Sequence, residues 1–165
     1  KVNVKIKHIC AGNHDDWLDS FVEEHPYLKN YKFKEACNFN DRNYIYHACG
    51  EYFKIGKLYY YHGHHFGGQY HTANHLRKLG CNIMYGHHHS MQQDSVTHMD
   101  GPKSAWSIGC LKDMSSEKNA WLGGRQHKWA HGFAIVDYYK GGRFTVHPIQ
   151  IVDGCASVWG EEIRG

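Results

Sequence analysis

Residues 58–65 read Leu-Tyr-Tyr-Tyr-His-Gly-His-His and residues 82–89 read Asn-Ile-Met-Tyr-Gly-His-His-His, and these two stretches decide the fold that the sequence predicts. Each is a short apolar run of strand type followed by glycine and histidine. Between them, residues 72–79 favour a short helix that ends at Gly80, because glycine readily takes the left-handed conformation that closes a helix. Strands that alternate with helices and turns are typical of an α/β fold.

The preceding segments extend this pattern toward the N-terminus. Residues 53–57 and 58–61 suggest a hairpin or bent strand around Gly56. Residues 2–10 suggest a strand that runs into a loop at residues 11–15. Asp16 can then cap a helix that Pro26 stops. Its apolar face would include Leu18, Phe21 and Val22.

Residues 27–51 have weak periodicity and suggest mixed loop and short strand. Beyond Ser90 the sequence favours strands, at residues 105–110, 132–137 and 149–152, with a hairpin over 138–146 that turns at Gly141-Gly142. We find no internal repeat and no proline-rich linker. The sequence therefore predicts one domain.

Composition indicates a water-soluble globular protein. The hydrophobic fraction is 41%, and no apolar run approaches the roughly 20 residues that span a bilayer. The six cysteines form no Cys-x-x-Cys pair, so we expect reduced, mostly buried thiols in a cytoplasm. Residues 1–7 alternate charged with aliphatic residues and do not resemble a signal peptide.

Histidine is the unusual residue of the chain. The formal net charge is only +3, which fits a phosphorylated substrate but gives no basic stripe for nucleic acid, whereas there are 16 histidines. Imidazole is the commonest metal ligand and a near-neutral acid or base. Because ligands of layered α/β folds lie beyond the carboxyl ends of strands, three histidine-bearing loops at such ends can converge on one site.

Three motifs carry a family resemblance: Gly12-Asn13-His14-Asp15, His62-Gly63, and Gly86-His87-His88-His89. In this order they resemble the last three signatures of the calcineurin-like metallophosphoesterases. Residues 121–124 and 129–133 are also similar to members from phage genomes. The resemblance implies that residues 1–165 are the C-terminal part of one such domain, an α-β-β-α sandwich with mixed sheets.

The resemblance also implies roles for individual residues. Asn13, His62 and His87 would ligate the second of two divalent metal ions (Mn, Fe, Zn or Ni), and His89 the first. His14 would assist the leaving-group oxygen, and Asp15 would orient His14. His64 and His65 would contact substrate or line a polar loop. Two such ions can activate water and clamp an in-line displacement of a phosphate mono- or diester.

Two further motifs of the family are missing. Neither its Asp-x-His strand nor its Gly-Asp-x-x-Asp loop occurs in the sequence, so the first metal lacks most of its ligands. We expect these residues alone to be inactive and to hold at most one weakly bound ion. A complementing N-terminal chain or a homo-oligomer would complete the site. The implied substrate is phosphorylated, and nucleic acids and nucleotides are among the candidates. No membrane partner is expected, and the expected compartment is the cytoplasm, that of the host if the chain is phage-encoded.

The same motifs are compatible with other functions. A non-enzymatic metal-binding or assembly subunit with a degenerate site is the main alternative, and a nucleic-acid-binding module ranks last. His88 is expected to belong to a polar loop, pointing away from its neighbours if the segment is extended. His71 and His75 are expected on a helix surface. The tryptophans Trp106, Trp121 and Trp129 are expected in a core or interface more than in base stacking. The remaining histidines singled out as structural or solvated are His8, His25, His47, His98, His127 and His147.

Overall fold

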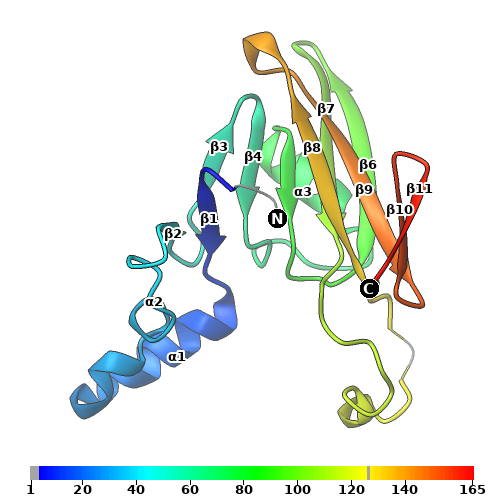
Figure 1. Ribbon diagram of the computed structural model, residues 1–165. Coiled ribbons are helices and arrows are strands. Elements are labelled where there is room, and N and C mark those ends of the chain that lie inside the picture. Colours follow the sequence, from blue (N-terminus) through cyan, green and yellow to red (C-terminus); the bar gives the residue numbers. More distant parts are fainter. Residues whose placement is uncertain (1–3, 126) are drawn as a thin grey trace. The chain divides into compact units, whose positions relative to one another are not determined.

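The computed structural model describes residues 4–125 and 127–165 (Figure 1). The chain divides into two compact units, residues 1–53 and 54–165, which are described separately below. The prediction that both belong to one domain stays a prediction.

The first unit joins a small parallel sheet to helices. Strand β1 (Lys7–Cys10) pairs in parallel with β2 (Tyr44–His47), and Lys7 lies opposite Tyr44. Between them lie α1 (Asn13–Glu24), a 3-10 helix η1 (Pro26–Tyr31) and the single turn α2 (Phe33–Ala36). Its buried apolar residues are Ala11, Val22 and Phe39. The region predicted as loop and strand thus contains two helical segments as well.

Helix α1 corrects the predicted start of the first helix. It begins at Asn13 and not after Asp16, because the Gly12 N–H donates to Asp15 Oδ2 at 2.7 Å and closes the first turn. Its end before Pro26 is as predicted. Of the predicted apolar face only Val22 is buried, whereas Leu18 and Phe21 are 43% and 51% exposed. Residues 2 and 3 of the predicted first strand lie outside the described residues.

The second unit contains a five-stranded mixed sheet in the order β3-β4-β5-β7-β6. Strands β4, β5 and β7 run parallel to one another, and β6 pairs antiparallel with β7. Strands β3 and β4 are neighbours in this sheet and are joined by a turn at Gly56, so of the two predicted alternatives the hairpin is found and not the bent strand. The strands are β3 (Phe53–Ile55), β4 (Leu58–Tyr61), β5 (Ile83–Tyr85), β6 (Met91–His98) and β7 (Gly101–Ile108).

A four-stranded sheet in the order β11-β10-β9-β8 belongs to the same unit, and its pairs are antiparallel. The predicted hairpin between β8 and β9 turns through the 3-10 segment η3 (Lys140–Gly142), which contains both glycines. A second 3-10 segment, η2 (Ala120–Leu122), lies in the long connection before β8. The strands are β8 (Gly132–Tyr138), β9 (Phe144–Val152), β10 (Cys155–Val158) and β11 (Glu161–Arg164).

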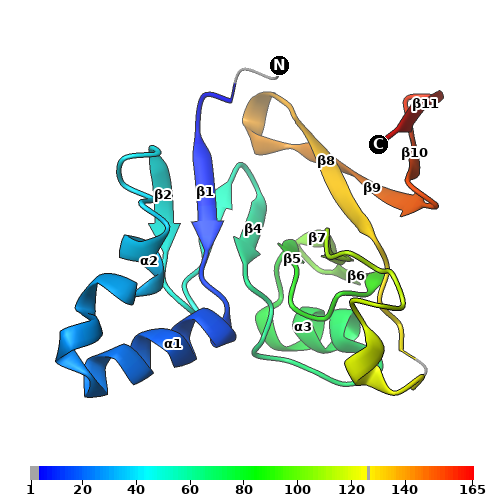
Figure 2. The same ribbon diagram turned by 60° about the horizontal axis from the view of Figure 1, so that its bottom comes forward.

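Side chains alternate between the two faces of each strand, and this alternation gives the second unit its layers. Leu58, Met84 and Trp106 form a core against residues of β8 and β9, among them Val136 and Phe144. Neighbouring residues on β4 and β5 point to the opposite face. Helix α3 (His71–Leu79) covers that face (Figure 2). The helix ends at Gly80, whose φ is 61°. The order of layers is therefore helix, mixed sheet, antiparallel sheet.

The coarse α/β class is confirmed by this mixture of helices and mixed sheets. Residues 58–61 and 83–85 are strands, and the helix predicted over 72–79 begins one residue earlier. Among the described residues, none of the helices has both the length and the apolar composition to cross a membrane.

Candidate functional site

His62 and His87 meet where two parallel strands end. His62 directly follows β4, and His87 follows β5 after Gly86. Because these strands are parallel neighbours, the two residues emerge at one edge of the sheet. His62 Nε2 lies 3.0 Å from His87 Nδ1, and the ring centroids are 4.9 Å apart at a steep angle. Of the three loops predicted to converge, the structure thus brings the ends of two together, at His62 and His87; that all three share one site stays a prediction.

The glycine next to His62 permits close packing beneath this pair. Gly63 has a φ of 115°, and a Cβ atom there would lie 2.6 Å from Cδ2 of Tyr85. The Gly86 N–H donates to the His62 carbonyl oxygen at 3.1 Å and joins the two loops. A larger residue than glycine at position 63 would therefore displace the Tyr85 ring.

The backbone of residues 87–89 spreads three consecutive side chains apart. His87 and His89 have φ of 55° and 57°, so the segment is not extended, and alternation does not describe it. His87 faces His62, whereas the His88 ring stacks on His71 with centroids 3.9 Å apart. The His89 ring packs edge-on against Trp129 at 4.9 Å. His88 Nε2–H donates to the Phe66 carbonyl, so His88 is part of a bonded loop, as expected.

Burial keeps the His87 imidazole neutral. Its pKa is lowered to about 4, first by burial and then by neighbouring imidazoles, beginning with His62. A neutral imidazole keeps a lone pair that can bind a metal ion.

The geometry of His62 and His87 suits two ligands of one ion. Imidazole nitrogens bound to one zinc at about 2.0–2.1 Å with a tetrahedral angle lie about 3.3 Å apart, close to the observed separation. Within residues 4–125 and 127–165, however, no three His, Cys, Asp or Glu side chains form a group arranged to hold a metal. Among the described residues of the second unit, His62 and His87 are therefore two side chains that could ligate one ion together.

His64 and His65 lie beside this pair. The His64 ring is 5.7 Å from that of His62 and 6.2 Å from that of His87, and it contacts His65 at 4.3 Å. His64 is partly buried and His65 is exposed. Their placement beside the His62–His87 pair agrees with either role expected of them, contact with substrate or part of a polar loop.

The Gly-Asn-His-Asp motif forms the first turn of α1 in the other unit. Asn13, His14 and Asp15 are its first three residues. His14 is exposed, with its ring 4.7 Å from that of Trp17, and Asp15 caps the helix through Gly12. That Asn13 joins His62 and His87, and that Asp15 orients His14, stay predictions.

The expectation for His71 and His75 is wrong, because both are buried, with exposed fractions of 4% and 0%. His75 Nδ1–H donates to the His71 carbonyl at 2.6 Å, and its Nε2 accepts the Tyr61 hydroxyl. His71 bonds Tyr85 Oη at 2.7 Å and Ser90 Oγ at 2.8 Å. Burial is the main cause that lowers the pKa of both histidines to about 4.

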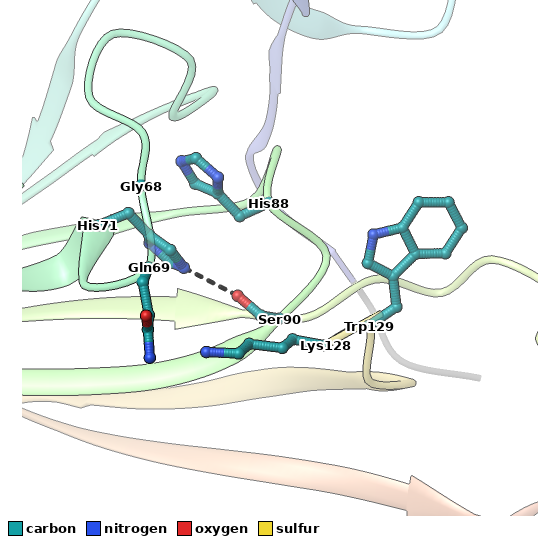
Figure 3. Close-up of a pocket in the computed structure, with 7 residues that line it drawn as sticks. All are labelled: Gly68, Gln69, His71, His88, Ser90, Lys128 and Trp129. Atoms are coloured by element: carbon teal, nitrogen blue, oxygen red, sulfur yellow. Dashed lines mark hydrogen bonds between the residues drawn. The ribbon is translucent and has the colours of Figure 1, made fainter. Parts of the chain in front are cut away.

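A pocket of about 390 Å³ lies beside this network (Figure 3). His88 and Ser90 line it on one side, and Lys128 and Trp129 enter from the long connection before β8 (Figure 3). The other lining residues are Gly68, Gln69 and His71. Lys128 was not predicted as a site residue, because it lies far along the chain from the histidine loops and no local motif marks it.

The tryptophans have different surroundings. Trp106 belongs to the core, with 8% of its surface exposed, so it cannot stack on a base. Trp121 is 63% exposed and contacts Trp129 at 5.8 Å.

A comparison with models of known protein families and with curated proteins finds no match to this chain.

Proposed function

We propose that the chain contributes ligands to a metal-dependent phosphoesterase that hydrolyses a phosphate mono- or diester. The observation that supports this most is the approach of His62 Nε2 to His87 Nδ1, 3.0 Å apart, at the ends of adjacent parallel strands. Resemblance of the surrounding motifs to calcineurin-like enzymes, and the helix, sheet and sheet layers of the second unit, add support.

The two imidazoles would hold one divalent ion together with the side-chain oxygen of Asn13. His87 is suited to this task because burial keeps it neutral. When bound, divalent ions supply Lewis-acid polarisation of the phosphoryl group. That ion is the second of the proposed pair, and His89 is the ligand proposed for the first.

His14 would transfer a proton to the leaving-group oxygen. Its ring is exposed on the first turn of α1, so a substrate can reach it. Proton transfer by a positioned imidazole typically contributes about 100- to 10,000-fold to the rate.

The carboxylate ligands of the proposed site would come from outside these 165 residues, which contain neither an Asp-x-His nor a Gly-Asp-x-x-Asp motif. Neutral imidazoles without a carboxylate favour Zn, Ni or Cu over Mg or Mn. The alternative function, a metal-binding subunit without catalysis, would need the imidazole pair of His62 and His87 but not the missing carboxylate motifs.

Metal binding tests the proposal directly. Cobalt(II) or zinc is titrated into the 165-residue chain and followed by visible absorption and calorimetry. We expect one weak ion, lost in His62→Ala and in His87→Ala but retained in the control His98→Ala, an exposed histidine on β6. Equal metal content in all four proteins would contradict the proposed ligands.

Hydrolysis separates the enzyme from the alternative. The chain alone should not hydrolyse a chromogenic phosphodiester in Mn, because its carboxylates are missing. Addition of a polypeptide that carries both missing motifs should give turnover that His14→Ala lowers without loss of metal. Metal binding without turnover in the completed protein would favour the non-enzymatic subunit.

A further inference from the structure

The pocket of Figure 3 offers hydrogen-bond donors and a positive charge. Its seven lining residues include a lysine, two histidines, a serine and a glutamine, and none of them is a carboxylate. Lys128 reaches across the pocket toward Gln69. The lysine and arginine ion pairs formed among the described residues use Lys32, Lys103 and Arg164. The Lys128 ammonium group is therefore available to an anion.

A buried hydrogen-bond chain can turn the Ser90 hydroxyl toward such an anion. Tyr85 Oη lies 2.7 Å from His71 Nδ1, and His71 Nε2 lies 2.8 Å from Ser90 Oγ. If Tyr85 donates to Nδ1, the neutral ring donates from Nε2 to Ser90, whose own proton is then free for a ligand. An anion in the pocket favours this tautomer, because every donor along the chain then points toward the charge.

The backbone around the pocket supports the same ligand. His71 is the first residue of α3, so the positive end of the helix dipole faces the pocket. Gly68, which has a φ of 98°, lets a ligand approach the main chain closely. Multiple donors around one lysine match the several oxygens of a phosphate group better than a single neutral acceptor.

We propose that this pocket binds a phosphate group of the substrate, next to the phosphate that is hydrolysed. His88 lines the pocket, and its ring is 4.8 Å from that of His87, whereas His62 and His87 do not line it. A phosphate held there is thus a neighbour of the imidazole pair and not its ligand. This inference rests on the proposed function, and it means that the substrate carries at least two phosphate groups.

Phosphate binding without metal tests the pocket itself. Inorganic phosphate is titrated into the 165-residue chain in a chelator, and imidazole and amide NMR shifts of His71, His88 and Ser90 are followed. Lys128→Ala should weaken binding about tenfold, since one charge-assisted hydrogen bond is lost. Lys128 is exposed, so the variant should fold. Lys118→Ala, an exposed lysine of the same connection, is the control. Equal phosphate affinity in wild type and Lys128→Ala would overturn the proposal that this pocket binds phosphate.

Two dinucleotide probes test the second phosphate. A thymidine dinucleotide with only its linking phosphate is compared with the same dinucleotide carrying a 5′-phosphate. The extra phosphate should improve binding about tenfold in the wild type and give no gain in Lys128→Ala. An equal gain in both proteins overturns the assignment.

The phosphate titration and the metal titration have independent outcomes. Loss of phosphate binding in Lys128→Ala with no metal bound by the wild type leaves the pocket supported and contradicts the metal site. Metal binding that depends on His62 together with unchanged phosphate affinity in Lys128→Ala overturns the pocket alone.

Discussion

A fully buried histidine is tolerated here because the fold supplies a partner for each ring nitrogen. His75 has 0% of its surface exposed, yet its Nδ1–H donates to a carbonyl and its Nε2 accepts a tyrosine hydroxyl. A buried polar group without such partners would cost about 1–3 kcal/mol. The bonds also fix one neutral tautomer of His75.

Neutral buried histidines make stability depend on pH. His71 and His75 have a pKa of about 4 in the folded chain, below the ordinary 6.5. Between these values the unfolded chain binds protons that the folded chain excludes. The free energy of unfolding should therefore be highest above pH 6.5 and fall toward pH 4, by about 1.4 kcal/mol per pH unit for each histidine. Urea unfolding across this range measures the slope.

Two variants distinguish the effect of His75 protonation on stability from the effect of lost packing and bonding around His75. His75→Phe removes one titrating ring and should reduce the slope by one histidine's share. Tyr61→Phe removes the hydroxyl that bonds His75 but keeps the ring, so it should lower stability while the slope remains. A slope unchanged in His75→Phe contradicts the assignment to His75.

At the residue scale, the approach of His62 to His87 could be predicted from the sequence, whereas the burial of His71 and His75 could not. A histidine before glycine at a strand end is a local signal. His75 bonds to Tyr61 and His71 bonds to Tyr85, and these partners lie on other elements that only the folded chain brings close. Helical spacing of two polar residues gives no sign of such partners, so exposure was expected.

At the scale of elements, one carboxylate determines where α1 begins. Asp15 accepts the Gly12 N–H at 2.7 Å, whereas its neighbour Asp16 is exposed. Asp15→Ala should lower the free energy of unfolding by about 1 kcal/mol, and the control Asp16→Ala by less. Chemical unfolding followed by circular dichroism measures both. Equal effects of the two variants would show that the bond to Gly12 contributes nothing.

Elements with strong local patterns were predicted better than those set by tertiary packing. The strands after residues 57 and 82, the helix before Gly80 and the hairpin at Gly141-Gly142 follow from apolar runs and glycines. Strand β6 was not foreseen, because Met91–His98 is mostly polar and is held by its long antiparallel pairing with β7. The early start of α1 was missed because Asp15, and not Asp16, caps it.

At the scale of the whole molecule, the two units differ in the size of their cores. Residues 4–53 bury few apolar side chains, whereas the described part of the second unit buries residues of β4, β5 and β7 between a helix and a second sheet. In native-state hydrogen exchange, amides of β5 should therefore exchange most slowly and those of β1 and β2 sooner. Equal protection of β1 and β5 would indicate that the units open together.

The divergence of residues 87–89 has a genetic consequence. Three adjacent codons specify side chains that serve three separate surroundings, at His62, His71 and Trp129. Left-handed backbone at the outer two positions leaves few replacements that the chain accepts without strain, chiefly glycine, asparagine and aspartate. A replacement at any one of these positions shifts the backbone that orients the other two side chains. The fitness effects of mutations at these codons should therefore be strongly epistatic. Selection would then act on this tripeptide as a single trait.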